Sequence, residues 1–89
     1  MLAKHLASLF DLPGDVVLNL PRLTMVGNLQ VIIENHRGVV EYSPRKVIIA
    51  YNQGRVILEG EELVIGTIQS EEIAVTGRVN SLLFCQKGE

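Results

Sequence analysis

The feature that most constrains the fold is a recurrence of apolar runs every sixteen residues, which begins after residue 15. An apolar run opens each block, and a turn-like segment, a second apolar stretch and another turn follow it. The runs are Val16-Val17, Val31-Ile32-Ile33, Val47-Ile48-Ile49, Leu63-Val64-Ile65 and Val79. Strand and turn units of about eight residues are typical of all-β proteins. The same period also fits a short β-solenoid with one coil per sixteen residues.

The segments between the apolar runs contain residues that suit tight connections between strands. Asn35-His36-Arg37-Gly38 and Asn52-Gln53-Gly54 supply Asn and Gly where a positive φ is needed. Leu20-Pro21 and Ser43-Pro44 would interrupt a helix and are tolerated at strand ends. We therefore predict an all-β fold over residues 15–85. It is either a short-strand meander or roll, or a small β-solenoid with about 16-residue repeats.

The first ten residues have a different, helical pattern. Four apolar residues fall near one face of a helix, namely Leu2, Leu6, Leu9 and Phe10. So short a helix is not stable alone, so it must dock on the domain's own sheet, a membrane surface or a partner. We predict a short amphipathic helix at residues 1–11 and a single β-rich domain at residues 12–89, since 89 residues make one domain.

The composition supports strands and argues against a nucleic-acid partner. Hydrophobic residues make up 47% of the chain, and most of them are Val, Ile and Leu. β-Branched side chains fit a pleated, half-buried surface. The net charge is −2 and the basic residues are scattered, whereas a nucleic-acid binder gathers its cations on one face. We therefore expect no nucleic-acid partner.

The cysteine content and the absence of long apolar runs predict a cytoplasmic protein. The single cysteine, Cys85, cannot form an internal disulfide, which fits a reducing setting. It follows Leu82-Leu83-Phe84, so we expect it to pack as a small apolar side chain. No apolar run approaches the ~18 residues of a membrane-spanning helix. The first ten residues also lack the apolar core of a signal peptide.

The sequence contains no recognisable catalytic or metal site. Glu34 and His36 lie two residues apart and could share one face of a strand, but two ligands are too few for a metal ion. A histidine in such an Asn-x-x-Gly turn is expected at the surface. Glu61-Glu62 and Glu71-Glu72 fall where turns are expected, and acid–base work would need a buried carboxyl group. We expect no catalytic residues, no enzymatic activity, no metal, no cofactor and no small-molecule substrate.

The apolar triplets place bulky side chains on both faces of their strands. One small sheet cannot cover both faces of so many strands. The N-terminal helix, a second sheet or another subunit must therefore cover the second face. This surplus of apolar surface predicts a homo-oligomer.

Three short motifs stand close together between residues 12 and 38: LPGDV, LPRLTMVG and IENHRG. They resemble the N-terminal half of the YabP/YqfC family of sporulation proteins. The matching residues are Leu12, Pro13, Asp15, Val16, Leu20, Pro21, Arg22, Leu23, Thr24, Gly27, Ile33, Glu34, Asn35, His36, Arg37 and Gly38. Residues 60–84 resemble the family's ending, with Ser70 where the family pattern has Pro.

The resemblance implies a process rather than a chemical reaction. It implies a protein that is made in the mother cell of a sporulating bacterium and takes part in spore envelope or cortex development. Our leading hypothesis within that process is a non-enzymatic adaptor or assembly factor, peripheral to the forespore membrane. A family member is encoded beside the membrane protein YqfD, so the implied partner is a membrane-anchored sporulation protein such as YqfD. The alternative is a self-polymerising structural β protein of the spore envelope.

Five polar residues within these motifs are candidate partner-binding residues: Arg22, Glu34, Asn35, His36 and Arg37. In a structural interpretation, Asn35–Gly38 forms a tight hairpin, and an ion pair between Arg22 and Glu34 fixes two strands. In a functional interpretation, the same residues form the docking surface for a partner, where charges set specificity and association rate more than affinity. The sequence leaves both open.

Overall fold

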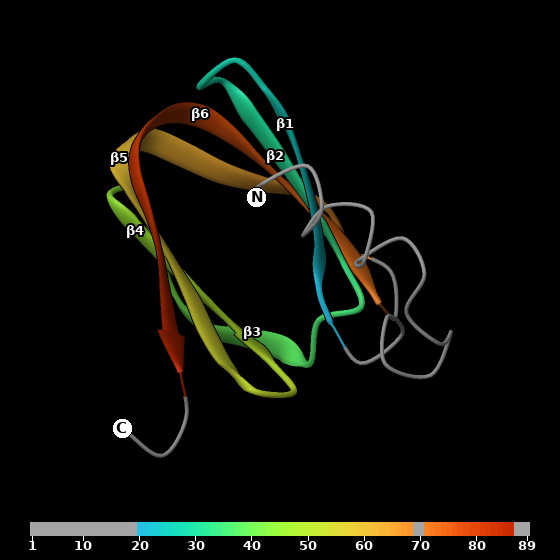
Figure 1. Ribbon diagram of the computed structural model, residues 1–89. Coiled ribbons are helices and arrows are strands. Elements are labelled where there is room, and N and C mark those ends of the chain that lie inside the picture. Colours follow the sequence, from blue (N-terminus) through green and yellow to red (C-terminus); the bar gives the residue numbers. More distant parts are fainter. Residues whose placement is uncertain (1–19, 69–70, 87–89) are drawn as a thin grey trace, which may run out of the picture.

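The described part of the structure, a computed structural model, comprises residues 20–68 and 71–86 and consists of six strands (Figure 1). They are β1 (Arg22–Val26), β2 (Gln30–Glu34), β3 (Gly38–Ser43), β4 (Lys46–Tyr51), β5 (Gly54–Ile68) and β6 (Glu72–Gln86). All six belong to one sheet with the order β1-β2-β6-β5-β4-β3. The all-β prediction is confirmed for these residues, and the helix predicted at residues 1–11 lies outside them.

The strands form a roll and not a stack of coils. Every strand pair in the sheet is antiparallel, whereas the coils of a solenoid pair in parallel. The sixteen-residue spacing separates strands in similar places instead. β2 and β4 begin sixteen residues apart, at Gln30 and Lys46, and β3 and β5 begin sixteen residues apart, at Gly38 and Gly54.

Two long, bent strands, β5 and β6, connect the two halves of the roll. The first half contains β1 and β2, and the second half contains β3 and β4. β5 and β6 have 15 residues each and pair with each other along most of their length. β2 pairs only with the first part of β6, Glu72–Thr76, while β4 pairs only with the first part of β5, Gly54–Glu59. Between these parts the β5–β6 register shifts, and such bulges bend a sheet. Figure 1 shows both long strands curving so that the halves face each other.

Each bend is covered by the turn of a neighbouring hairpin. The Gly60 N–H donates to the Arg45 carbonyl in the β3–β4 turn (3.0 Å), and the Gly77 N–H donates to the Leu29 carbonyl in the β1–β2 turn (3.1 Å). A Cβ atom at Gly60 would lie 1.8 Å from the Arg78 carbonyl oxygen. The close approach of the two bent strands therefore requires glycine at this position.

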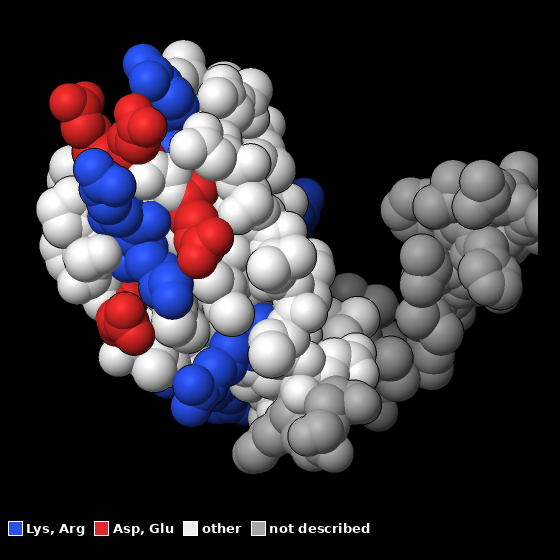
Figure 2. Space-filling view, turned by 90° about the vertical axis from the view of Figure 1, so that its left-hand side faces the viewer, with Lys and Arg blue, Asp and Glu red and all other residues white. Residues whose placement is uncertain are grey.

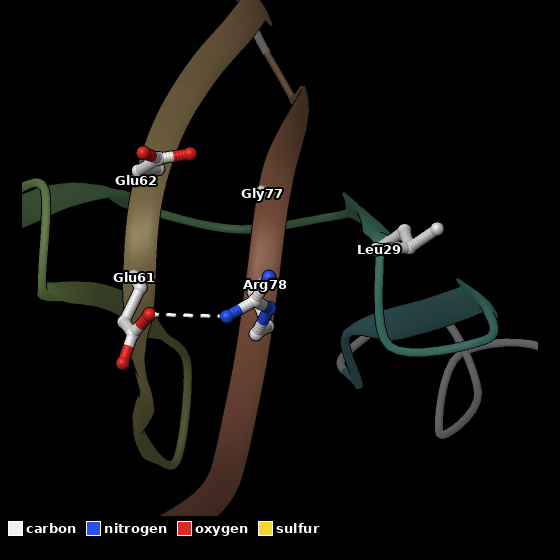
Figure 3. A pocket seen from close by; sticks show the side chains of 5 residues that line it. All are labelled: Leu29, Glu61, Glu62, Gly77 and Arg78. Atoms are coloured by element: carbon white, nitrogen blue, oxygen red, sulfur yellow. Dashed lines mark hydrogen bonds and ion pairs between the residues drawn. The ribbon is translucent and has the colours of Figure 1, made fainter.

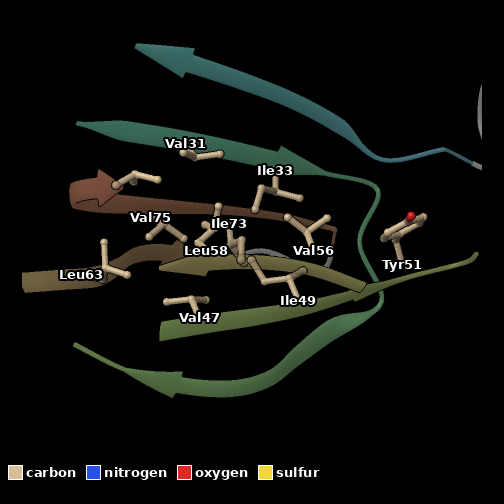
Figure 4. Close-up of a cluster of buried hydrophobic side chains, with 11 residues drawn as sticks. Val31, Ile33, Val47, Ile49, Tyr51, Val56, Leu58, Leu63, Ile73 and Val75 are labelled. Atoms are coloured by element: carbon tan, nitrogen blue, oxygen red, sulfur yellow. The ribbon is translucent and has the colours of Figure 1, made fainter. Parts of the chain in front are cut away.

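The hydrophobic core lies between the two halves and takes side chains from both (Figure 4). Its buried members are Val31, Ile33, Val47, Ile49, Tyr51, Val56, Leu58, Leu63, Ile73, Val75 and Val79. Side chains alternate in the first part of β5, where Val56 and Leu58 are buried while Arg55 and Glu59 are exposed. In β2 and β4 the outer residues of each apolar triplet are fully buried, whereas the middle residues, Ile32 and Ile48, are half-buried on the other face.

The prediction that Cys85 packs as a small apolar side chain is wrong, because its side chain is exposed. Cys85 lies opposite Arg55 on the outward face of the β5–β6 pair, while the preceding Phe84 lies opposite the buried Val56. Alternation thus turns the thiol away from the core. Residues 20–68 and 71–86 include no helix with the length and apolar character needed to cross a membrane.

Candidate functional site

Four of the five candidate residues lie at the end of β2 and in the connection that leads to β3. β2 pairs with β1 and β6, whereas β3 pairs with β4, so these strands belong to different halves of the roll. The prediction that Asn35–Gly38 forms a tight hairpin is therefore wrong. Asn and Gly did indicate backbone of positive φ, with 64° at Asn35 and 125° at Gly38, but the chain crosses between the halves here instead of pairing with itself. We call Asn35–Arg37 the crossover.

The crossover ties the two halves together through its backbone. The Asn35 N–H donates to the carbonyl of Glu71, just before β6 in the first half (2.7 Å). The Arg37 N–H donates to the carbonyl of Ala50 in β4, in the second half (2.7 Å). The Asn35 side-chain Nδ2 also donates to the Leu20 carbonyl (2.9 Å). Because these bonds reach three separate parts of the chain, the crossover closes the roll at this end.

His36 lies inside the crossover and is only 6% exposed, so the expectation of a surface histidine is wrong. Its Nδ1 accepts a hydrogen bond from the Gly38 N–H (2.9 Å), which places the proton of the neutral ring on Nε2. Nε2 is buried, and no residue in the described part of the chain accepts its proton. Burial lowers the pKa of His36 below the ordinary 6.5, although the Glu71 carboxylate opposes this in part. The neutral, buried His36 ring is therefore part of the structure of the crossover and not part of an exposed binding surface.

Arg22 and Glu34 lie directly opposite each other in the β1–β2 register, on the outward face. The ion pairs found in the described part of the chain are Lys46–Glu59 and Arg78–Glu61, so the predicted ion pair between Arg22 and Glu34 is not formed. Arg22 is exposed, and so is Arg37 in the crossover. Of the five candidate residues, these two arginines are the ones with exposed side chains.

A depression at the bend of the roll is lined by five residues: Leu29, Glu61, Glu62, Gly77 and Arg78 (Figure 3). The Arg78 guanidinium donates to the Glu61 carboxylate (3.2 Å), and both side chains are more than half exposed. An exposed pair of this kind contributes little stability. The described ranges of the chain contain no group of three or more His, Cys, Asp or Glu side chains that could hold a metal ion.

Sequence reasoning missed a set of core-facing side chains that are exposed. Among the residues that the structure describes, ten large hydrophobic side chains are exposed: Leu20, Met25, Val26, Leu29, Val39, Val40, Tyr42, Val64, Leu83 and Phe84. Four of them lie opposite buried core residues, since Met25 faces Val31, Val39 faces Ile49, Tyr42 faces Val47 and Phe84 faces Val56. They are exposed because β1 and β3 end the sheet and the second half of β6 has β5 on one side only.

Charged side chains are unevenly distributed over the face that Figure 2 shows. In Figure 2 the Lys, Arg, Asp and Glu side chains gather, with both signs interleaved, over one part of the visible face. A broad area beside them carries no charged side chain. Sequence patterns do not predict which apolar side chains are exposed, because an apolar run has the same pattern in a central strand and in an edge strand.

Comparison with known proteins places these features in a family. Residues 19–89 match the model of the YabP family. The chain is 40% identical over 76 residues to the Bacillus subtilis (strain 168) protein named "Uncharacterized protein YqfC", a match that covers 85% of this chain and 82% of that protein. No solved structure matches the chain significantly. With most of its length matched in both comparisons, the chain belongs to the YabP family.

Proposed function

We propose that this YabP-family chain is a non-enzymatic adaptor or assembly factor that binds other proteins during spore envelope or cortex development, in the mother cell. The observation that carries the proposal is the exposure of Met25, Val39, Tyr42 and Phe84, which are 38–57% exposed at core-facing positions. Apolar side chains that continue a core out to the surface are typical of a protein–protein interface. The resemblance to sporulation proteins supports the process.

The exposed arginines near the crossover supply the polar part of this proposed interface. Arg22 and Arg37 are both exposed and lie near the same end of the roll, where backbone bonds hold the crossover in place. Charged side chains at the rim of an interface steer association and select the partner. The partner proposed from the resemblance is the cytoplasmic part of a membrane-anchored sporulation protein such as YqfD, which would hold this chain at the periphery of the forespore membrane.

Partner capture followed by direct binding tests the proposal. A tagged chain is purified from sporulating cells in mild detergent, and each co-purifying membrane protein is produced as its cytoplasmic part and titrated against the purified chain. We expect Met25→Glu and Arg22→Ala to weaken binding while the chain stays folded. His36→Ala is the contrasting variant, because its buried ring should affect stability first. A captured protein that binds all surface variants as tightly as the native chain would contradict the proposal.

The second candidate function is a self-polymerising structural protein of the spore envelope. The observation that favours it is that, among the described strands, β1 and β3 end the sheet and each pairs on one side only. Unpaired edges can add strands from other copies, and two different edges joined head to tail give an open filament. Filaments in electron micrographs of the purified chain would support this function, and a discrete small oligomer would reject it.

A further inference from the structure

In the described part of the chain, the second half of β6 pairs with a strand on one side only. β2 covers the edge of β6 only from Glu72 to Thr76, and the β1–β2 turn accepts one further bond, from the Val79 N–H to the Asn28 carbonyl (2.8 Å). Beyond Val79, the described residues provide no strand on this side. On its other side β6 pairs with β5 in an unbroken register from Ser81 to Gln86. Among the described residues, half of the backbone N–H and carbonyl groups in this regular stretch of β6 therefore have no partner strand.

This edge lacks the features that protect the other edges of the sheet. β3 carries a bulge and Glu41, while β1 has only five residues and carries Arg22. The second half of β5 has register shifts, and the Leu63 N–H already donates to the Pro44 carbonyl. Residues 79–86, in contrast, contain no charge, proline or glycine. Natural proteins seldom leave such an edge uncovered, because it adds strands from other chains.

The side chains of this edge are self-complementary about Leu83. Residues 80–86 read NSLLFCQ. Reversed about Leu83, the segment matches itself in kind: an amide at each end, then a small hydroxyl and a small thiol, then an apolar side chain on each side of the centre. We infer that β6 pairs antiparallel with β6 of a second copy of this chain, with Leu83 opposite Leu83 at the two-fold axis.

The pairing continues the existing structure without a mismatch. Directly opposite residues point to the same face, so Leu82 would meet Phe84 of the second copy on the core-facing side. Leu82 already packs against the core, and Phe84 makes an edge-on contact with Tyr51 at 6.2 Å between ring centres. Leu83 and Phe84 are each 57% exposed in the single copy and would be covered. The same surface is used twice, as a two-fold dimer requires.

The inference goes beyond the proposed adaptor function, because it assigns a surface for self-association; the choice of membrane partner is separate. The first test is the mass of the purified chain in solution by analytical ultracentrifugation. We expect a dimer, and we expect Leu83→Glu to raise its dissociation constant by roughly tenfold or more, because two carboxylates would face each other. The matched control is Leu29→Glu, in the β1–β2 turn, where a leucine of similar exposure (62%) lies off this edge and the dimer should persist.

Disulfide cross-linking tests the register without relying on loss of the dimer. Ser81 would lie opposite Cys85 of the second copy, and opposite residues in antiparallel strands have Cα atoms about 4.5–5.5 Å apart, within disulfide range. Ser81→Cys with the native Cys85 should therefore give covalent dimers on mild oxidation. The two positions are four residues apart on one strand, or roughly 13 Å, so no link forms within a single copy.

Two further variants fix the centre of the pairing. Leu83→Cys combined with Cys85→Ser should cross-link at the two-fold axis, whereas Ser81→Cys combined with Cys85→Ser should not cross-link. A monomeric native chain, a dimer that Leu83→Glu leaves intact, or the reverse cross-linking pattern would overturn the inference. Capture of a membrane partner by a monomeric chain would leave the adaptor function standing, and a dimer without a partner would leave the inference standing.

Discussion

At the scale of single residues, the burial of His36 makes folding sensitive to pH. Burial lowers the pKa of His36 below the ordinary 6.5 that the ring has in the unfolded chain. Around and below pH 6.5 the unfolded state therefore binds more protons than the folded state, and stability decreases as the pH falls toward the folded-state pKa. Above 6.5 this group contributes no pH dependence.

For the native chain, we expect the urea concentration at the midpoint of unfolding to decrease when the pH is lowered from about 7.5 to about 5.5. In His36→Asn the amide oxygen can still accept the bond from the Gly38 N–H, and this part of the pH dependence should disappear. Urea titrations of both proteins at several pH values measure the difference. If the urea midpoint changed with pH by the same amount in both proteins, His36 would not be the titrating group.

A pair of glycines in β5 tests the packing of the bend. In Gly60→Ala the new Cβ would lie 1.8 Å from the Arg78 carbonyl oxygen, and the three nearest atoms all belong to the β6 backbone, so no flexible side chain can move aside. We expect a loss of about 2–4 kcal/mol, in the range of strained or overpacked substitutions. At Gly66 the nearest atom is 3.7 Å away, so Gly66→Ala should stabilise by about 0.5 kcal/mol. Thermal unfolding of both variants decides this, and equal effects would contradict the predicted contact.

At the scale of elements, the sequence predicted the strands better than the connections between them. The turn at Asn52-Gln53 is a two-residue hairpin between β4 and β5, as the Asn and Gly residues indicated. Glu61-Glu62 was expected in a turn, but both residues lie within β5, where Glu62 has a φ of 55°. The bend depends on bonds from the β3–β4 turn, far away in the chain. A local sequence pattern gives no information about such long-range hydrogen bonds.

Substitutions in the crossover should lower stability more when they disfavour its backbone conformation than when they remove a polar side chain. Asn35 has a φ of 64°, a conformation that asparagine and glycine tolerate and that other residues adopt at about 1–2 kcal/mol. We expect Asn35→Ala to lower the free energy of unfolding by about 1–2 kcal/mol for this reason, and to lose the hydrogen bond to the Leu20 carbonyl as well. Asn35→Gly should lose less, since it keeps the conformation. Urea unfolding ranks the two variants, and a more harmful glycine would show that the side chain dominates.

At the scale of the whole molecule, the continuity of β5 and β6 predicts a single unfolding transition. Ile33 from one half and Ile49 from the other are both fully buried in the same core. Ile33→Ala and Ile49→Ala should each lower stability by about 2–5 kcal/mol. Calorimetry and circular dichroism should show one cooperative transition in both variants. Separate transitions for the two halves would contradict the shared core.

The candidate site could be predicted only in part, for a reason that also lies at this scale. The structural interpretation of the motifs placed Arg22 and Glu34 on two paired strands, and they do lie opposite each other, although the predicted ion pair is not formed. The burial of His36 and the exposure of Phe84 depend on which strands end the sheet, and sheet order is a property of the whole chain. The apolar surplus inferred from the triplets appears at strand edges, where no periodicity marks it.

The placement of β2 beside β6 affects how the protein is made. The first described hairpin, β1–β2, is synthesised before β3, β4 and β5, yet the strand that covers it, β6, follows all of them in the chain. A lone two-stranded hairpin is marginally stable in water, so Val31 and Ile33 stay unprotected until β6 arrives. β3, β4 and β5 pair with their neighbours in sequence and need no such delay. Nascent chains that stop before Glu72 should therefore be the ones that recruit chaperones.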